Sequence, residues 1–143
     1  MTYSIGAFKA QHFAMVSNAD DIQGGAEMPD PYTLSLMEQS SNVVTVFHDG
    51  FPIAVGGTLQ LWPGRHMAFC AIPQYAGRHM TAITRIARAL MAAAPGRIEA
   101  SVLVDFAAGH RWMKLLGFKV ETPRMELYDP NGRDHTGYVR INR

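Results

Sequence analysis

The stretch Arg65–Met91 decides the fold, and it reads RHMAFCAI (65–72), PQYAGRHMT (73–81) and AITRIARALM (82–91). The run Met67–Ile72 is short and almost wholly apolar, which favours a strand buried on both faces. Pro73 has no amide hydrogen to donate to a neighbouring strand, so it marks the end of pairing. Beyond a short polar loop, apolar residues recur at helical spacing and predict one buried helix face: Ile83, Ile86, Ala87, Leu90, Met91 and Ala94.

A strand that ends in a loop and leads into a helix leaves free backbone amides at the start of that helix. Such amides form an anion site, and Arg78 and His79 stand beside them in this chain. An ordinary strand-to-helix turn explains the same residues. Both interpretations stay open at this point.

The composition predicts one globular domain over residues 1–143. Hydrophobic residues make up 48% of the chain and charged residues 17%, which is typical of a folded protein. A net charge of +1 gives no electrostatic reason to expect nucleic acid as a partner. No apolar run approaches the roughly 20 residues that span a bilayer, and the N-terminus lacks a signal-peptide pattern. We therefore expect neither a nucleic-acid nor a membrane partner.

The chain has a single cysteine, Cys70, which excludes an intrachain disulfide and a cysteine-based zinc site. An apolar strand raises the pKa of a thiol, so we expect Cys70 to pack in the core rather than act as a nucleophile. His12, His48 and His135 show no spacing that suggests metal ligation. The sequence therefore predicts no metal, and a reducing cytoplasmic location.

The N-terminal part predicts an edge strand over residues 3–8, a helix over 10–16 and a polar loop over 18–29. Asp30 and Pro31 are typical of a helix start, and this helix would run to Gln39 and bury Tyr32, Leu36 and Met37. Strand-forming residues follow from residue 43. The turn Asp49-Gly50 then predicts a hairpin with a return strand over 51–62.

Gly56 and Gly57 interrupt that return strand, which suggests a bulge or a close backbone approach. After the central helix, residues 98–104 predict another buried strand. Asp105 would cap a helix over 106–116 that ends at Gly117. Its predicted apolar positions are Ala108, Trp112, Leu115 and Leu116, with Gly109 and Met113 alongside. Strands over 118–121 and 138–141, with a turn at 129–132, complete the chain.

This order of elements, together with two segments, resembles the GNAT family of acetyl-CoA-dependent N-acetyltransferases. The segment Ile72–Thr81, IPQYAGRHMT, is similar to the family's pyrophosphate-binding loop, V-x-P-x-Y-R-G-x-G-x-G/A. The segment Asp105–Phe118, DFAAGHRWMKLLGF, is similar to its last helix, which usually ends in Y-x-x-L-G-F. The resemblance covers residues 42–118 and is weak at both ends. It implies an α/β (α+β) fold: a mixed, mainly antiparallel sheet of six to seven strands, flanked by about four helices.

The chain departs from the family's pattern at positions that matter for chemistry. Ala76 stands where the family usually has Arg or Gln, His79 where it has its central Gly, and Thr81 where it has Gly or Ala. A histidine at the central position would fit only if its ring swung outward, where it would contact phosphate. Met113 replaces the family's proton-donating Tyr, and a thioether has no proton to donate. Phe106 replaces the common Asn.

The resemblance implies acetyl-CoA as a weakly bound cofactor, with the acetyl carbonyl held by backbone amides near Ala71 and Ile72. Arg78 is the strongest single cofactor residue, because a guanidinium beside a helix start suits phosphate. The full set of implied cofactor-binding residues is Ala71, Ile72, Gly77, Arg78, His79, Met80 and Thr81.

Transfer to an amine needs a base with a pKa near neutrality. His66 is the nearest candidate on the central strand, although its place at the strand entry equally suits a solvent-exposed residue. Asp105 is a second candidate, and capping of the last helix would also explain it. His110 lies near the expected thiolate and would replace the missing Tyr as an acid.

Two functions remain open from the sequence. One is an N-acetyltransferase that acts on an unknown amine. The other follows from the form H-R-W-x-K-x-L-G-F, which resembles small GNAT-like head-morphogenesis or internal-core proteins of tailed phages. That alternative implies a catalytically eroded scaffold with an assembly or interaction role, located in the host cytoplasm. The expected partners are an amine acceptor or another protein, and a homodimer is left open.

Overall fold

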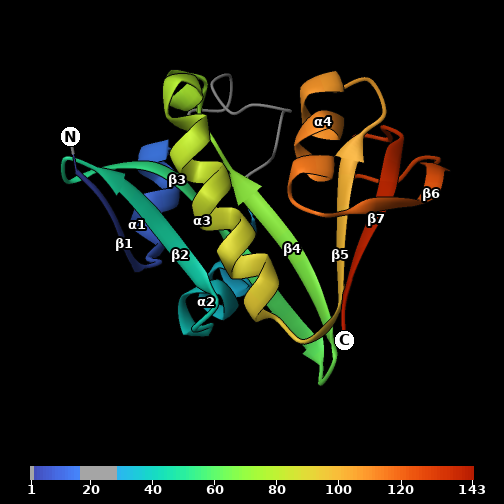
Figure 1. The fold of residues 1–143 in the computed structure, drawn as a ribbon, viewed down its shortest axis with the longest axis horizontal. Helices are drawn as coiled ribbons and strands as arrows, with labels where there is room; N and C mark the ends of the chain where they lie inside the picture. The colour runs from blue at the N-terminus through green and yellow to red at the C-terminus, as the bar shows by residue number, and fades with distance from the viewer. Residues whose placement is uncertain (1, 17–28) are drawn as a thin grey trace.

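The computed structural model describes residues 2–16 and 29–143 (Figure 1). The loop predicted over residues 18–29 lies, except for Pro29, outside the described residues. The elements follow the predicted order, with an added 3₁₀ helix, η2: β1 (Tyr3–Ala7), α1 (Ala10–Val16), α2 (Pro31–Gln39), β2 (Val43–His48), β3 (Phe51–Trp62), β4 (Arg65–Ala71), η2 (Gln74–His79), α3 (Met80–Ala93), β5 (Gly96–Leu103), α4 (Ala107–Leu115), β6 (Lys119–Met125) and β7 (His135–Asn142).

Within the described residues, seven strands form a single sheet in the order β1-β2-β3-β4-β5-β7-β6. Every neighbouring pair is antiparallel except β4 and β5, which run parallel. A parallel pair needs a crossover connection, and α3 supplies it. The predicted fold class, a mixed and mainly antiparallel sheet flanked by helices, is confirmed. None of the helices in these ranges has the length and apolar character that crossing a membrane requires.

The helices divide between the two faces of the sheet (Figure 1). Val55 packs under α1 and α2, whereas Ala54 packs under α3, because successive residues of a strand point to opposite faces. The core under α1 and α2 contains Phe8, Phe13, Val16, Leu34, Met37, Val43, Val55 and Ala71. The core beneath α4 and the end of α3 contains Met91, Ala94, Ile98, Val102, Met113, Leu116, Phe118 and Tyr138.

The predicted start of α2 is confirmed, but two of the three side chains predicted to be buried are exposed. The carboxylate of Asp30 accepts a hydrogen bond from the amide of Thr33 at 2.8 Å and so caps the helix. Leu34 and Met37, one turn apart, are the buried residues. Tyr32, by contrast, is 74% exposed and Leu36 is 40% exposed. The prediction for these two side chains was wrong, because a nine-residue helix with scattered apolar residues has no single face that its sequence selects.

The last helix also differs from its prediction at the start and on one face. It begins at Ala107 with Phe106 as the cap residue and no side-chain cap, so the predicted capping by Asp105 is wrong. Gly109, Met113 and Leu116 face the core, and Leu115 is 60% exposed. Gly109 sets this face, since a Cβ there would lie 2.6 Å from the ring of Phe106.

Gly57 marks a close approach between two backbones rather than a bulge. A Cβ on Gly57 would lie 1.9 Å from the carbonyl oxygen of Asn42, and its φ is +149°. The same carbonyl accepts a hydrogen bond from the amide of Thr58 at 3.1 Å. The register shifts of β3 lie elsewhere, opposite Val46–Phe47 and at Gln60–Trp62. The tight β2–β3 contact therefore needs glycine at position 57.

We expect Gly57→Ala to lower the free energy of unfolding by more than about 2 kcal/mol, because the new methyl group overlaps backbone at a strained φ. Urea unfolding measures it. Gly77→Ala is the control: nothing lies within 4 Å of a Cβ there. That variant should stay within about 1 kcal/mol of the wild type. Equal stability of both variants would show that β2 can move away from position 57.

Candidate functional site

The two central strands separate soon after they begin. β4 and β5 are in register only at Arg65–Arg97, His66–Ile98 and Met67–Glu99. Over its remaining length β4 pairs with β3, and β5 pairs with β7. Residues 68–71 and 100–103 therefore face each other across an opening, and Figure 1 shows the two strands diverging toward their C-terminal ends. This opening leaves backbone groups on the facing strand edges available to a ligand.

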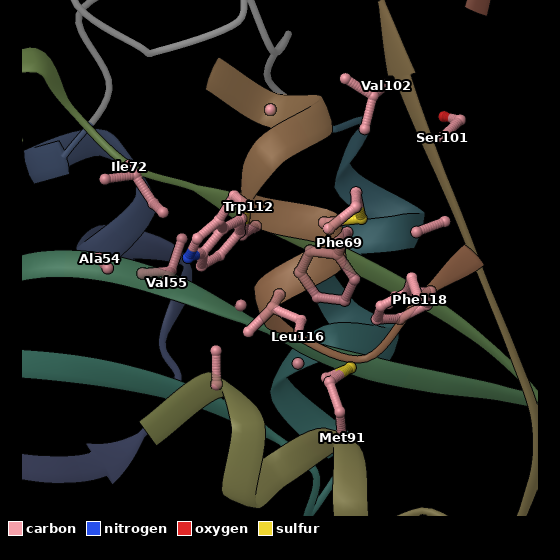
Figure 2. A pocket seen from close by; sticks show the side chains of 18 of the residues that line it. Ala54, Val55, Phe69, Ile72, Met91, Ser101, Val102, Trp112, Leu116 and Phe118 are labelled. Atoms are coloured by element: carbon pink, nitrogen blue, oxygen red, sulfur yellow. The ribbon is translucent and has the colours of Figure 1, made fainter. Parts of the chain in front are cut away.

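An apolar pocket of about 390 Å³ occupies this opening (Figure 2). Its walls come from the strands β2–β5, from α3 and α4, and from the segment that leads into β7. Figure 2 shows Trp112 and Leu116 from α4, Met91 from α3 and Phe69 from β4 around one space. The indole Nε1 of half-buried Trp112 donates to Thr84 Oγ1 at 2.8 Å, which joins α4 to α3 above the sheet.

Ala71 and Ile72 lie at the distal end of β4, beside this opening. Ile72 lines the pocket, and Ala71 is buried against the core under α1 and α2. Ala71 is the last residue of β4 and Ile72 follows it, and their role in holding the acetyl carbonyl stays a prediction.

The segment expected to bind pyrophosphate is wound as the 3₁₀ helix η2, which runs directly into α3. The amide of Ala76 donates to the carbonyl of Pro73 at 3.1 Å, and the amide of Met80 donates to the carbonyl of Gly77. These internal bonds occupy amides that an open loop would offer to an anion. Arg78, Gly77 and Thr81 are exposed at this start of α3.

His79 points inward, so the expectation that its ring swings outward to phosphate is wrong. The side chain is 5% exposed, and its Nδ1 lies 2.7 Å from the hydroxyl of Tyr3 on β1. The guanidinium Nε of Arg78 donates to Nε2 of His79 at 3.3 Å, and the ring of His48 packs at 4.3 Å between centroids. Tyr3, 76 positions earlier in the chain, contacts the buried ring of His79, and the local sequence does not reveal this contact.

The three acid–base candidates from the sequence do not line the pocket. His66 is buried at the paired end of β4, where Nε2 donates to the carbonyl of Pro95 at 3.1 Å. His110 donates from Nε2 to the carbonyls of Leu103 and Val104, and its Nδ1 lies 2.5 Å from the hydroxyl of Tyr138.

Asp105, the third candidate, is exposed outside the pocket lining. Structural hydrogen bonds account for both histidines, so the geometry does not favour any of the three as the base.

Sequence reasoning missed a polar group at one end of the pocket, formed by Asp129, Arg133 and His135. Asp129 accepts hydrogen bonds from His135 Nε2 at 2.9 Å and from Arg133 Nε at 2.7 Å. The bond from His135, followed by those from Arg133, holds the pKa of this carboxyl well below its usual range, although desolvation opposes the shift. The clustering of these residues in DPNGRDH is the sequence signal for this polar group, but the predicted turn at 129–132 already accounts for most of these residues.

Cys70 is exposed at the pocket wall rather than packed in the core as predicted. Desolvation of the thiol by the surrounding protein nevertheless raises its pKa to about 11. The thiol is therefore neutral near pH 7, which agrees with the expectation that it is not a nucleophile.

Comparison with known proteins identifies the fold. The ribosomal-protein-S18-alanine N-acetyltransferase from Escherichia coli matches with a TM-score of 0.72 and 14% identity, over 99% of this chain and 96% of that one. Ard1 from Thermoplasma volcanium matches at 0.72 and 14%, over 100% and 99%. A GNAT-family acetyltransferase from Bacillus anthracis matches at 0.71 and 14%, over 97% and 94%. No protein-family model and no curated protein sequence matches the chain. The chain therefore has the fold of GNAT N-acetyltransferases, and at this identity the likeness concerns the fold alone.

The inward position of His79 predicts a pH-dependent stability. Burial lowers the pKa of His79, and the charges of His48 and Arg78 lower it further, whereas Asp49 raises it. The unfolded chain therefore takes up this proton at a higher pH than the folded protein does. The stability that neutral His79 contributes is fully present above its unfolded-state pKa and is lost as the pH falls through its folded-state pKa.

We expect His79→Gln to lose less stability than the wild type between pH 7.5 and pH 5, measured by urea unfolding at both values. Arg85→Gln, at an exposed position of α3, should keep the wild-type dependence. An unchanged pH dependence in His79→Gln would show that other groups cause it.

Proposed function

We propose that this protein is an N-acetyltransferase of the GNAT type, which transfers the acetyl group of acetyl-CoA to an amine. The observation that carries the proposal is the separation of β4 and β5 beyond Met67, which leaves an apolar pocket beside a free strand edge. The similar fold of the Escherichia coli, Thermoplasma volcanium and Bacillus anthracis proteins supports it.

The pocket suits the arm of acetyl-CoA that carries the thioester. This arm is extended and contains amide groups, which pair with the free edge of a strand as an added strand would. The apolar side chains that line the pocket exclude water from the thioester. Backbone amides near Ala71 and Ile72 would donate to the acetyl oxygen and stabilise the negative charge that develops there during attack.

The phosphates would lie at the start of α3. The positive end of the helix dipole and the exposed guanidinium of Arg78 both favour an anion there. Gly77 and Thr81 leave this surface accessible. Because η2 occupies some of the amides, we expect acetyl-CoA to bind more weakly than it would to an open loop.

The leaving thiolate needs a proton, and the helix that usually supplies it lacks a donor. Met113 is a thioether, and the Nε2 hydrogen of His110 is already given to two backbone carbonyls. The proton must therefore come from the amine itself or from water.

Calorimetric titration of the full chain with acetyl-CoA tests this function. Saturable binding is expected, and ligand at 100 times its Kd should raise the free energy of unfolding by roughly 2.7 kcal/mol. Arg78→Ala should weaken binding by about 1–3 kcal/mol, because a charge-assisted hydrogen bond is lost. Arg88→Ala, exposed further along α3, is the matched control and should bind as the wild type does. Absence of binding at millimolar acetyl-CoA would reject the enzyme and favour the non-catalytic scaffold that the sequence left open.

Cys70 reports where the ligand lies, since it is the single cysteine of the chain and lines the pocket. Saturating acetyl-CoA should slow its alkylation by a maleimide, measured by mass spectrometry. Adenosine 3′,5′-bisphosphate, which lacks the thioester arm, is the control and should give little protection. Equal alkylation rates with and without acetyl-CoA would mean that the arm binds outside the pocket.

The acceptor amine is a matter for direct assay. The similar Escherichia coli enzyme is by name an alanine N-acetyltransferase. A short peptide with a free N-terminal alanine is therefore the first acceptor to supply, with release of the CoA thiol as the readout.

A further inference from the structure

The end of the pocket beside β5 contains an imidazole whose surroundings determine which ring nitrogen carries the hydrogen. His135 is the first residue of β7 and pairs across the sheet with Leu103, the last residue of β5. Both residues line the pocket, together with Ser101 and Asp129. Among the described residues that line the pocket, His135 is the one histidine. It lies beside the last residue of β5, at the end where β5 has diverged from β4, and it lines the same pocket as Ile72.

Asp129 determines which ring nitrogen of His135 carries the hydrogen. Its carboxylate accepts from His135 Nε2, from Arg133 Nε and from the backbone amides of Asn131 and Arg133. A carboxylate held by these donors is ionised and can only accept. The hydrogen of the neutral ring is therefore on Nε2, and Nδ1 carries a lone pair.

That lone pair is unused in the structure. Nδ1 of His135 is buried and has no hydrogen-bond partner among the described residues. A buried acceptor without a donor is unfavourable, and such atoms in folded proteins call for a ligand or a catalytic role. An N–H group of a ligand in the pocket would satisfy it.

The charged groups around His135 lie in the segment 129–135 itself. Asp129 contacts the ring directly, and Asp134 lies on the same segment, where it also binds Arg124 and the amide of Leu127. Arg133 is bound to Asp129. The ring of Tyr128 packs against His135 at 5.1 Å between centroids. Its strand partners, Leu103 on β5 and Met125 on β6, carry no charge.

We propose that His135 is the base that accepts the proton of the acceptor ammonium, and that Asp129 is its positioning residue. This inference rests on the proposed acetyl transfer. Nδ1 takes one proton from the ammonium, and the Asp129 carboxylate stabilises the imidazolium. The freed nitrogen lone pair attacks the thioester carbonyl, so that a C–N bond forms and the C–S bond breaks. A second amine proton passes to the sulfur, which leaves as the thiol, and the amide keeps the third. His135 then releases its proton to water.

Nδ1 is closed to solvent in this structure. We therefore expect the ring to shift when the amine binds, because catalytic hydrogen bonds often form fully only in the substrate complex.

The experiment compares wild type with His135→Gln, and with His12→Gln as a matched control. His12 is half-buried and bonds to Thr45 at 2.7 Å, away from the pocket. Two nucleophiles are supplied with acetyl-CoA at pH 7: the alanine peptide, whose amine is protonated, and hydroxylamine, which is neutral and needs no base. His135→Gln should lower kcat/KM for the peptide by about 10²–10⁴-fold and should retain transfer to hydroxylamine and acetyl-CoA affinity. His12→Gln should match the wild type in peptide acetylation, in hydroxylamine acetylation and in acetyl-CoA affinity.

A second variant and a spectrum test the role of Asp129 independently of rate. Asp129→Asn should allow the hydrogen of the neutral His135 ring onto Nδ1, because an amide group can donate to Nε2 where the carboxylate only accepts. In the wild type, ¹⁵N NMR of the neutral His135 ring should show the hydrogen on Nε2. A hydrogen on Nδ1 would overturn the proposal whether or not transfer is seen.

The outcomes separate this inference from the function beneath it. A wild type that does not bind acetyl-CoA rejects acetyl transfer, and the role of His135 with it. A wild type that binds acetyl-CoA but acetylates neither nucleophile also rejects acetyl transfer, and the role of His135 with it. Equal rates of peptide acetylation in wild type and His135→Gln would overturn only the assignment of His135 as the base. Loss of acetylation of both the peptide and hydroxylamine in His135→Gln would overturn it too, because that result would indicate a structural role.

Discussion

The short parallel contact between β4 and β5 is the constraint on which the rest of the molecule depends. It spans the pairs from Arg65–Arg97 to Met67–Glu99, and beyond it each strand belongs to its own half of the sheet. Ionic contacts hold the closed end, where Arg65 and Arg97 both bind Glu99 and Arg97 also binds Glu121 on β6. These contacts lower the pKa of Glu99, chiefly through its hydrogen bond from Arg65, so the carboxylate stays charged. The sheet is therefore closed at one end and open at the other.

The helices cover one face of that opening and, with the strands, form an apolar pocket. α3 crosses between the two strands because a parallel pair requires a crossover, and α4 follows β5 onto the same face. Trp112 packs against the hydrophobic cores beneath α3 and α4, and its indole donates a hydrogen bond to Thr84. Arg78 is exposed at the start of α3, and Asp129 and His135 line the pocket beside the last residue of β5. A long ligand with a charged end, an apolar middle and a reactive tip matches that distribution.

The departures from the family's motifs are accommodated by parts of the chain outside those motifs. His79 occupies a glycine position without closing the surface, because Tyr3 and His48 receive its ring. Arg78 is tied to the same ring, so the buried histidine also orients the exposed guanidinium. Met113 stands where the family has its usual proton donor, and His135, the proposed base, lies on β7 beside the end of β5.

The sequence by itself determined the elements, because periodicity, turns and caps are local properties: the hairpin at Asp49-Gly50, the cap at Asp30, the strand before Pro73 and the helix after it all lie where they were predicted. It also determined that residues 65–91 form the centre of the fold. Only the tertiary structure decided which side chains meet. Tyr3 reaches His79, and Asp129 and His135 reach the end of β5, through sheet pairings between segments far apart in the chain. Local patterns carry no information on such pairings. The residues that surround His79 and the polar residues at the end of the pocket therefore could not be predicted from the sequence.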